Sequence, residues 1–164
     1  MTENATQTLI IITGSPCVGK TTVADALFVT LENSAFCDGD WMWCVNPFSL
    51  SDPRLRNGDR NMSFVLSTYL NSGFNYVLFS YVGAINEQIR QTILNGITAK
   101  NFKTIGVTLT CSEPTLIERH SKRGDTTEVS FQWLHEPAYP GDYVINTDGK
   151  TVVQIAEEIR KLLA

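Results

Sequence analysis

The sequence lacks features that would assign it to several large classes of protein. No apolar run approaches the roughly 20 residues that a membrane-spanning helix needs. Residues 1–7 are polar and carry no basic and apolar pattern typical of a secretory signal. The four cysteines form no Cys-x-x-Cys pair and have no histidine spacing suited to zinc, which favours free thiols and a cytoplasmic location. The net charge of −4 argues against non-specific nucleic-acid binding. We therefore expect no membrane and no nucleic acid among the partners.

A phosphate-binding motif stands near the N-terminus. Gly-x-x-x-x-Gly-Lys-Thr spans residues 14–21 and follows the apolar run 9–12 directly, in the required context of strand, loop and helix. Its glycines let backbone N–H groups approach a phosphate at the positive end of a helix dipole. We expect Lys20 to reach the β- and γ-phosphates and the Thr21 hydroxyl to bind Mg²⁺. The expected nucleotide-binding residues of the loop are Gly14, Ser15, Pro16, Cys17, Val18, Gly19, Lys20, Thr21 and Thr22.

Apolar runs and helical stripes alternate along the chain. Strands are expected at 9–13, 35–37, 76–80, 104–109 and 143–146. Helices are expected at 19–32, 61–71 and 84–99, then near Pro114 and after the capping box that Thr151 forms with Gln154. This alternation predicts an α/β protein with a five-stranded parallel sheet, helices on both faces and a short lid, in the three-layer P-loop NTPase arrangement. We expect residues 1–164 to form a single domain.

Several polar residues follow the expected strands and should therefore gather at the carboxyl edge of the sheet, where such sheets bind ligands. They are Asp38, Asp40, Ser80, Arg119, Arg123 and Thr147. A solvated helix face is the alternative explanation for the two arginines. His120 and His135 show no zinc-binding pattern.

The sequence lacks the motifs that define other classes of P-loop protein. A GTPase needs Asp-x-x-Gly and Asn-Lys-x-Asp, and here no aspartate is followed by glycine three residues later. The motifs of transporter ATPases are also absent, and the chain is short for a motor or a remodelling ATPase.

The remaining pattern resembles the small P-loop kinases of the nucleoside-monophosphate-kinase-like group, which includes shikimate, gluconate and adenylylsulfate kinases and chloramphenicol phosphotransferase. Besides the phosphate loop, the resemblance rests on Asp38-Gly39-Asp40 and on Arg119-x-x-x-Arg123. It covers essentially the whole chain.

The resemblance implies a role for each of these residues. Asp40 would accept the proton of the phosphoryl acceptor, while Asp38, with Thr21, would act through the Mg²⁺ shell. No aspartate ends the third strand, where Ser80 stands, so the metal role falls to Asp38. Arg119 and Arg123 would clamp phosphates as a lid closes, and Arg119 would also pack on the adenine. The loop containing Thr147 would read the adenine edge.

Two regions surround this centre. An acceptor-binding insertion is expected at about residues 41–60 and the lid at about residues 112–142. Trp41 and Trp43 would stack on a planar acceptor, with Arg54, Arg56 or Arg60 pairing to an anionic group. Alternatively, the tryptophans pin the loop to the core and the arginines are solvated.

The sequence thus predicts an ATP- and Mg²⁺-dependent kinase whose small-molecule acceptor is a nucleotide, a nucleoside or another hydroxyl compound. The aromatic insertion also fits an antibiotic-modifying phosphotransferase of the chloramphenicol type. A nucleotide-binding regulator without transfer activity is the alternative from another class. The oligomeric state is not predicted.

Overall fold

The computed structural model describes residues 6–124 and 126–164, so residues 1–5, most of the N-terminal stretch predicted not to be a secretory signal, lie outside the described part. The strands are β1 (Gln7–Gly14), β2 (Ser34–Asp38), β3 (Tyr76–Ser80), β4 (Phe102–Thr110) and β5 (Tyr143–Asn146). The α-helices are α1 (Lys20–Phe28), α2 (Gly58–Asn71), α3 (Glu87–Asn95), α4 (Glu113–Arg123), α5 (Gln132–His135) and α6 (Val152–Lys161). Short 3₁₀ helices occupy η1 (Gly39–Trp43), η2 (Pro53–Asn57) and η3 (Val82–Ile85).

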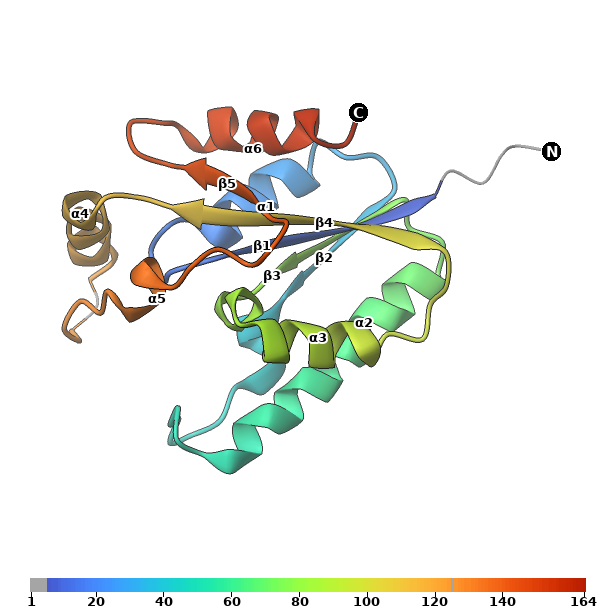
Figure 1. The fold of residues 1–164 in the computed structure, drawn as a ribbon, viewed down its shortest axis with the longest axis horizontal. Coiled ribbons are helices and arrows are strands. Elements are labelled where there is room, and N and C mark those ends of the chain that lie inside the picture. Colours follow the sequence, from blue (N-terminus) through green and yellow to red (C-terminus); the bar gives the residue numbers. More distant parts are fainter. Residues whose placement is uncertain (1–5, 125) are drawn as a thin grey trace.

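The five strands form one parallel sheet in the order β2-β3-β1-β4-β5. β1 lies at its centre because its apolar run is buried from Thr8 to Gly14, as a strand covered on both faces requires. The predicted fold class is therefore confirmed. Figure 1 shows α1 and α6 on one face of the sheet and α2 and α3 on the other.

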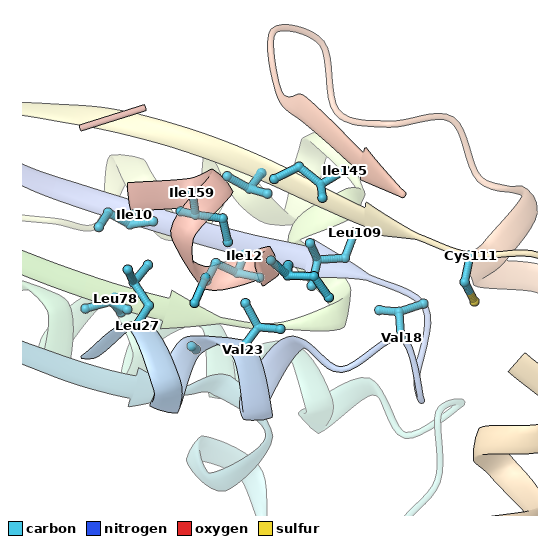
Figure 2. Packing of buried hydrophobic residues seen from close by; sticks show 14 of the residues in the cluster. Ile10, Ile12, Val18, Val23, Leu27, Leu78, Leu109, Cys111, Ile145 and Ile159 are labelled. Carbon is cyan, nitrogen blue, oxygen red and sulfur yellow. The ribbon is translucent and has the colours of Figure 1, made fainter. Parts of the chain in front are cut away.

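Each face of the sheet carries its own apolar core, because successive side chains of β1 point to opposite faces. Ile10 and Ile12 pack with Leu27 of α1 and Ile159 of α6, a cluster that Figure 2 shows at close range. Leu9 and Ile11 pack instead with residues of α2 and α3. These two cores fix the sheet between the helices and so fix the positions of the strand ends.

Several helix boundaries differ from the predicted ones, among them the end of α3 at Asn95 rather than at residue 99. The helix predicted at 84–99 is interrupted, because the Asn86 side chain accepts a hydrogen bond from the Ile89 N–H and starts α3 anew after η3. α1 ends at Phe28 rather than at residue 32. α2 begins at Gly58, where the Cβ of any larger residue would lie 3.1 Å from the Trp43 side chain.

The carboxyl ends of the strands share one edge of the sheet. Figure 1 shows α4 and α5 beyond the tip of β4 at this edge. Asp38 is the last residue of β2 and pairs in register with Ser80, the last residue of β3. Within the described ranges, none of the helices is long and apolar enough to cross a membrane.

Candidate active site

The loop between β1 and α1 adopts a backbone that few residues allow. Gly14 has φ +132°, and a Cβ there would lie 2.2 Å from the Leu109 carbonyl oxygen. Cys17 has φ 66° and Gly19 has φ 100°, both in the left-handed region. Gly19 caps α1 without a side-chain hydrogen bond, so the N–H groups of the first turn keep no side-chain partner. The loop thus presents a helix N-terminus suited to phosphate.

Lys20 and Val18 anchor this loop from within. The buried Val18 packs in the core near Cys111 (Figure 2). Lys20 donates from Nζ to the Ser15 carbonyl oxygen at 2.9 Å, and burial lowers the pKa of Lys20 to about 8, against the opposing effect of Asp40 and Asp38. The ammonium group is therefore held inside the loop, where little water solvates its charge. A bound anion would stabilise that charge.

Thr21 and Asp38 meet at the mouth of the loop. The Thr21 hydroxyl donates to Asp38 Oδ2 at 2.7 Å, and Asp38 Oδ1 accepts a hydrogen bond from the Asp40 N–H at 3.0 Å. A hydroxyl and a carboxylate side by side are hard oxygen ligands, and Mg²⁺ typically takes only one or two protein carboxylates besides phosphates and water. The pair fits Mg²⁺, although the described residues hold no cluster of three or more metal-ligating side chains.

Asp40 stands in η1, immediately after Gly39. A Cβ at Gly39 would lie 2.7 Å from the Tyr81 ring, so glycine lets the turn pack closely against that ring. Loss of solvent around the Asp40 carboxylate, and next the charge of Asp38, raise its pKa, while Lys20 and Arg123 act in the opposite direction. Asp40 is therefore a stronger base than an ordinary aspartate.

The two arginines of α4 have different surroundings. Arg119 donates from Nη1 to the Thr147 hydroxyl at 2.8 Å and to the Val18 carbonyl oxygen at 3.2 Å, and from Nη2 to the Thr147 carbonyl oxygen at 3.1 Å. Arg119 thus ties α4 to the phosphate loop and to the loop after β5. Arg123 is exposed, with its Nη1 4.0 Å from Cys17 Sγ. The solvated-face alternative does not describe Arg119.

Two cavities meet at this edge of the sheet. The first, of about 720 Å³, is lined by the phosphate loop and by Asp38, Asp40, Arg119 and Arg123. The second, of about 1070 Å³, is lined mainly by apolar residues of the segment between β2 and α2. Among the described residues, the linings share Asp40, Cys44 and Val82. Asp40 therefore stands on the wall between a phosphate-binding cavity and an apolar one.

The aromatic and basic residues predicted to bind an acceptor do not all line the same cavity. Trp43 and Arg56 line the apolar cavity, whereas the exposed Trp41 lines the phosphate cavity. Arg54 is exposed and forms an ion pair with Asp52 at 2.7 Å. Arg60 lies on neither lining. Of the three arginines, only Arg56 lines the predicted acceptor site.

Sequence reasoning missed several residues of the two linings. Tyr81 and Val82 directly follow β3, where only Ser80 was predicted to face the site. Trp133 lies in α5, far from the insertion in sequence, and lines the apolar cavity with Gln132. A tryptophan in a segment without a regular apolar pattern is the one sequence signal that could have identified it.

Comparisons with known proteins agree with this fold. The tunicamycin resistance protein of Deinococcus radiodurans is 19% identical, with a TM-score of 0.71 and coverage of 97% of this chain and 96% of that chain. The APS kinase of Mycobacterium tuberculosis, solved with AMPPNP and APS, is 15% identical, with a TM-score of 0.69 and coverage of 96% and 98%. The shikimate kinase of Acinetobacter baumannii, solved with shikimate, is 22% identical, with a TM-score of 0.61 and coverage of 97% of this chain and 94% of that chain.

These structures show that the fold is shared with small P-loop kinases, as the sequence motifs predicted. A comparison with curated proteins finds no significant match. A family described as AAA domain matches residues 10–131, which include the phosphate loop, both aspartates and both arginines. Because the matched residues are well over half of the sequence, this chain belongs to the AAA domain family.

Proposed function

We propose that this protein is an ATP- and Mg²⁺-dependent kinase that transfers the γ-phosphoryl group of ATP to a small molecule. The observation that carries the proposal is the position of Asp40 on the wall shared by the two cavities. A nucleotide in the phosphate cavity and an acceptor in the apolar cavity would meet at that carboxylate. The structures of similar fold that are named as kinases support the same reaction class.

The residues of the phosphate cavity would bind and orient the triphosphate. Lys20 exchanges its hydrogen bond to Ser15 for the β- and γ-phosphate oxygens, and the N-terminus of α1 receives the phosphates. Thr21 and Asp38 hold Mg²⁺, which supplies charge neutralisation when bound. Arg119 lines the base-binding side and is held there by Thr147, which is buried and lies outside the cavity lining. Arg123 lines the same cavity.

Asp40 would accept the proton of the acceptor hydroxyl. The bond between the acceptor oxygen and the γ-phosphorus forms while the bond from that phosphorus to the bridging oxygen breaks, so ADP leaves with the bond electrons. The raised pKa of Asp40 makes it a better proton acceptor than an ordinary aspartate. Residues 41–60 act as the acceptor-binding insertion and residues 112–142 as the lid that excludes water.

The substitution Asp40→Asn tests the proposal against a regulator that binds nucleotide without transfer. We expect acceptor-dependent ADP release to fall on the order of a hundredfold or more, while binding of the non-hydrolysable analogue AMPPNP persists. Asp25→Asn, an exposed aspartate on α1, is the matched control and should leave both unchanged. Undiminished turnover in Asp40→Asn would refute the assigned role.

The apolar character of the second cavity favours one acceptor type within this proposal, an aromatic compound of the kind that chloramphenicol-type phosphotransferases modify. A panel of nucleosides, nucleoside monophosphates, sugar acids and phenicol, macrolide and aminoglycoside antibiotics should be compared with ATP alone. The compound that raises ADP release well above the background identifies the acceptor class.

A further inference from the structure

The second cavity is walled by large apolar side chains from five parts of the chain. Its described lining includes Trp43 from η1, Phe48 and Leu50 from the following loop, Leu55 from η2, Met62 from α2 and Trp133 from α5. Phe48 and Leu50 are 58% and 70% exposed, and neither belongs to the apolar cores. Exposed large apolar side chains gathered at the rim of a cavity mark a binding surface for an apolar ligand.

The charges around this cavity do not favour an anion. Among the described residues of its lining, only Asp40 and Arg56 are charged. Arg56 Nη1 lies 3.3 Å from Asp59 Oδ1, and its Nη2 donates to the Tyr81 hydroxyl at 3.2 Å. The Asp59 side chain is only 3% exposed, so Arg56 neutralises a buried carboxylate.

An anionic acceptor would therefore compete with Asp59 for Arg56. Drawing the guanidinium away would leave a buried carboxylate uncompensated, which is costly. The same acceptor would also approach Asp40, whose positive neighbours Lys20 and Arg123 line the phosphate cavity and not this one. An uncharged acceptor neither competes with Asp59 for Arg56 nor is repelled by the Asp40 carboxylate.

We infer that the phosphoryl acceptor is an uncharged alcohol with an aromatic or aliphatic body, held between Trp43 and Trp133, and not a nucleotide, a sugar acid or another anion. This inference rests on the proposed kinase function and specifies its acceptor. The hydroxyl lies towards Asp40, its oxygen takes the γ-phosphoryl group, and its proton passes to that carboxylate.

A matched pair of probes separates charge from shape. The methyl ester of a hydroxymethyl-biphenyl carboxylic acid and the corresponding free carboxylate share the rings and the hydroxyl and differ by one charge. Each is titrated by calorimetry into the full chain with AMPPNP and Mg²⁺, and each is assayed with ATP for ADP release. We expect the ester to bind at least about tenfold more tightly than the carboxylate. Equal or tighter binding of the carboxylate, or no binding of either probe, would overturn the inference.

A charge placed at the cavity rim provides a second measurement. Leu50→Arg changes an exposed residue, so the chain should fold, and we expect it to raise the affinity for the carboxylate probe about tenfold. Phe64→Arg is the matched control, because Phe64 is 73% exposed on α2 and lies outside the lining. If both variants affect the carboxylate equally, the ligand does not occupy this cavity.

The two proposals fail in different ways. If the carboxylate is bound and phosphorylated better than the ester, the kinase function stands and the acceptor class is wrong. The opposite result has a different meaning. If the ester binds selectively, Leu50→Arg raises the affinity for the carboxylate as expected, and the ester is never phosphorylated, then the inferred ligand class stands and the transfer reaction is wrong.

Discussion

At the scale of single residues, the protonation of Lys20 makes the stability of the folded chain depend on pH. Its pKa is lowered from 10.5 to about 8 in the folded chain, chiefly by burial. Between these two values the unfolded chain holds more protons than the folded chain, so this group makes stability rise as pH rises through that window. Below it, the cost of burying the ammonium group is fully present.

Phosphates beside Lys20 should raise its pKa again. We therefore expect AMPPNP binding to take up about one proton at about pH 9, measured by calorimetry in buffers of different ionisation enthalpy. In Lys20→Arg the side chain stays protonated at this pH, so the uptake should disappear. Unchanged proton uptake in that variant would assign the proton to another group.

The residues of the phosphate loop could be located from sequence because their spacing is local. Gly14 and Gly19 stand in a motif whose backbone demands are met by few residues, and the structure shows both with positive φ. Trp133 could not be located in this way. Trp133 and Trp43 line the same cavity because the segment between α4 and β5 lies near the segment between β2 and α2, and no local sequence pattern encodes that proximity.

At the scale of elements, the proposed kinase function gives the two arginines of α4 separate tasks. Arg119→Ala breaks contacts to Thr147 and Val18, so we expect weaker AMPPNP binding. Arg123→Ala should lower the turnover number on the order of a hundredfold with a smaller effect on AMPPNP binding, because it removes charge stabilisation near the moving phosphoryl group. Steady-state kinetics and calorimetry separate the two effects.

Lys122→Ala is the control within α4, because this exposed lysine is paired with Glu118 one turn away. Its turnover should match that of the unaltered chain. A loss as large as that of Arg123→Ala would point to general disturbance of the helix rather than to a specific arginine.

Element boundaries were predicted less well than element types, and α3 shows why. Isoleucines at positions 85, 89, 93 and 97 form one continuous stripe, which predicts a single helix. Ile89, Ile93 and Ile97 pack in one core, but Asn86 separates η3 from α3 and caps α3 with its side chain. A capping residue inside a periodic pattern is indistinguishable in sequence from a polar residue on the exposed face.

At the scale of the whole molecule, a buried ion pair joins distant parts of the chain. Arg90 Nη1 of α3 donates to Asp142 Oδ1 at 2.6 Å, and the Thr108 hydroxyl of β4 donates to the same carboxylate. The Arg90 guanidinium also lies 3.8 Å from the centre of the Tyr139 ring. These contacts fix the segment just before β5 against the sheet.

Asp142→Ala should therefore destabilise the fold by about 3–5 kcal/mol, because it leaves the buried Arg90 without its counterion. Urea denaturation measures the change. Arg160→Ala, which breaks an exposed pair with Glu157, should change the free energy of unfolding little. The double variant Arg90→Met with Asp142→Leu should recover much of the loss, and a double variant as unstable as Asp142→Ala would contradict this explanation.

The partition between the two cavities has a consequence for how such a protein diversifies. In the described part of the chain, only Asp40, Cys44 and Val82 belong to both linings. Mutations can therefore change the lining of the apolar cavity while the lining of the phosphate cavity stays the same. Under the proposed kinase function, the source of the phosphoryl group and its destination lie in separate cavities, so selection can change one while the other is kept.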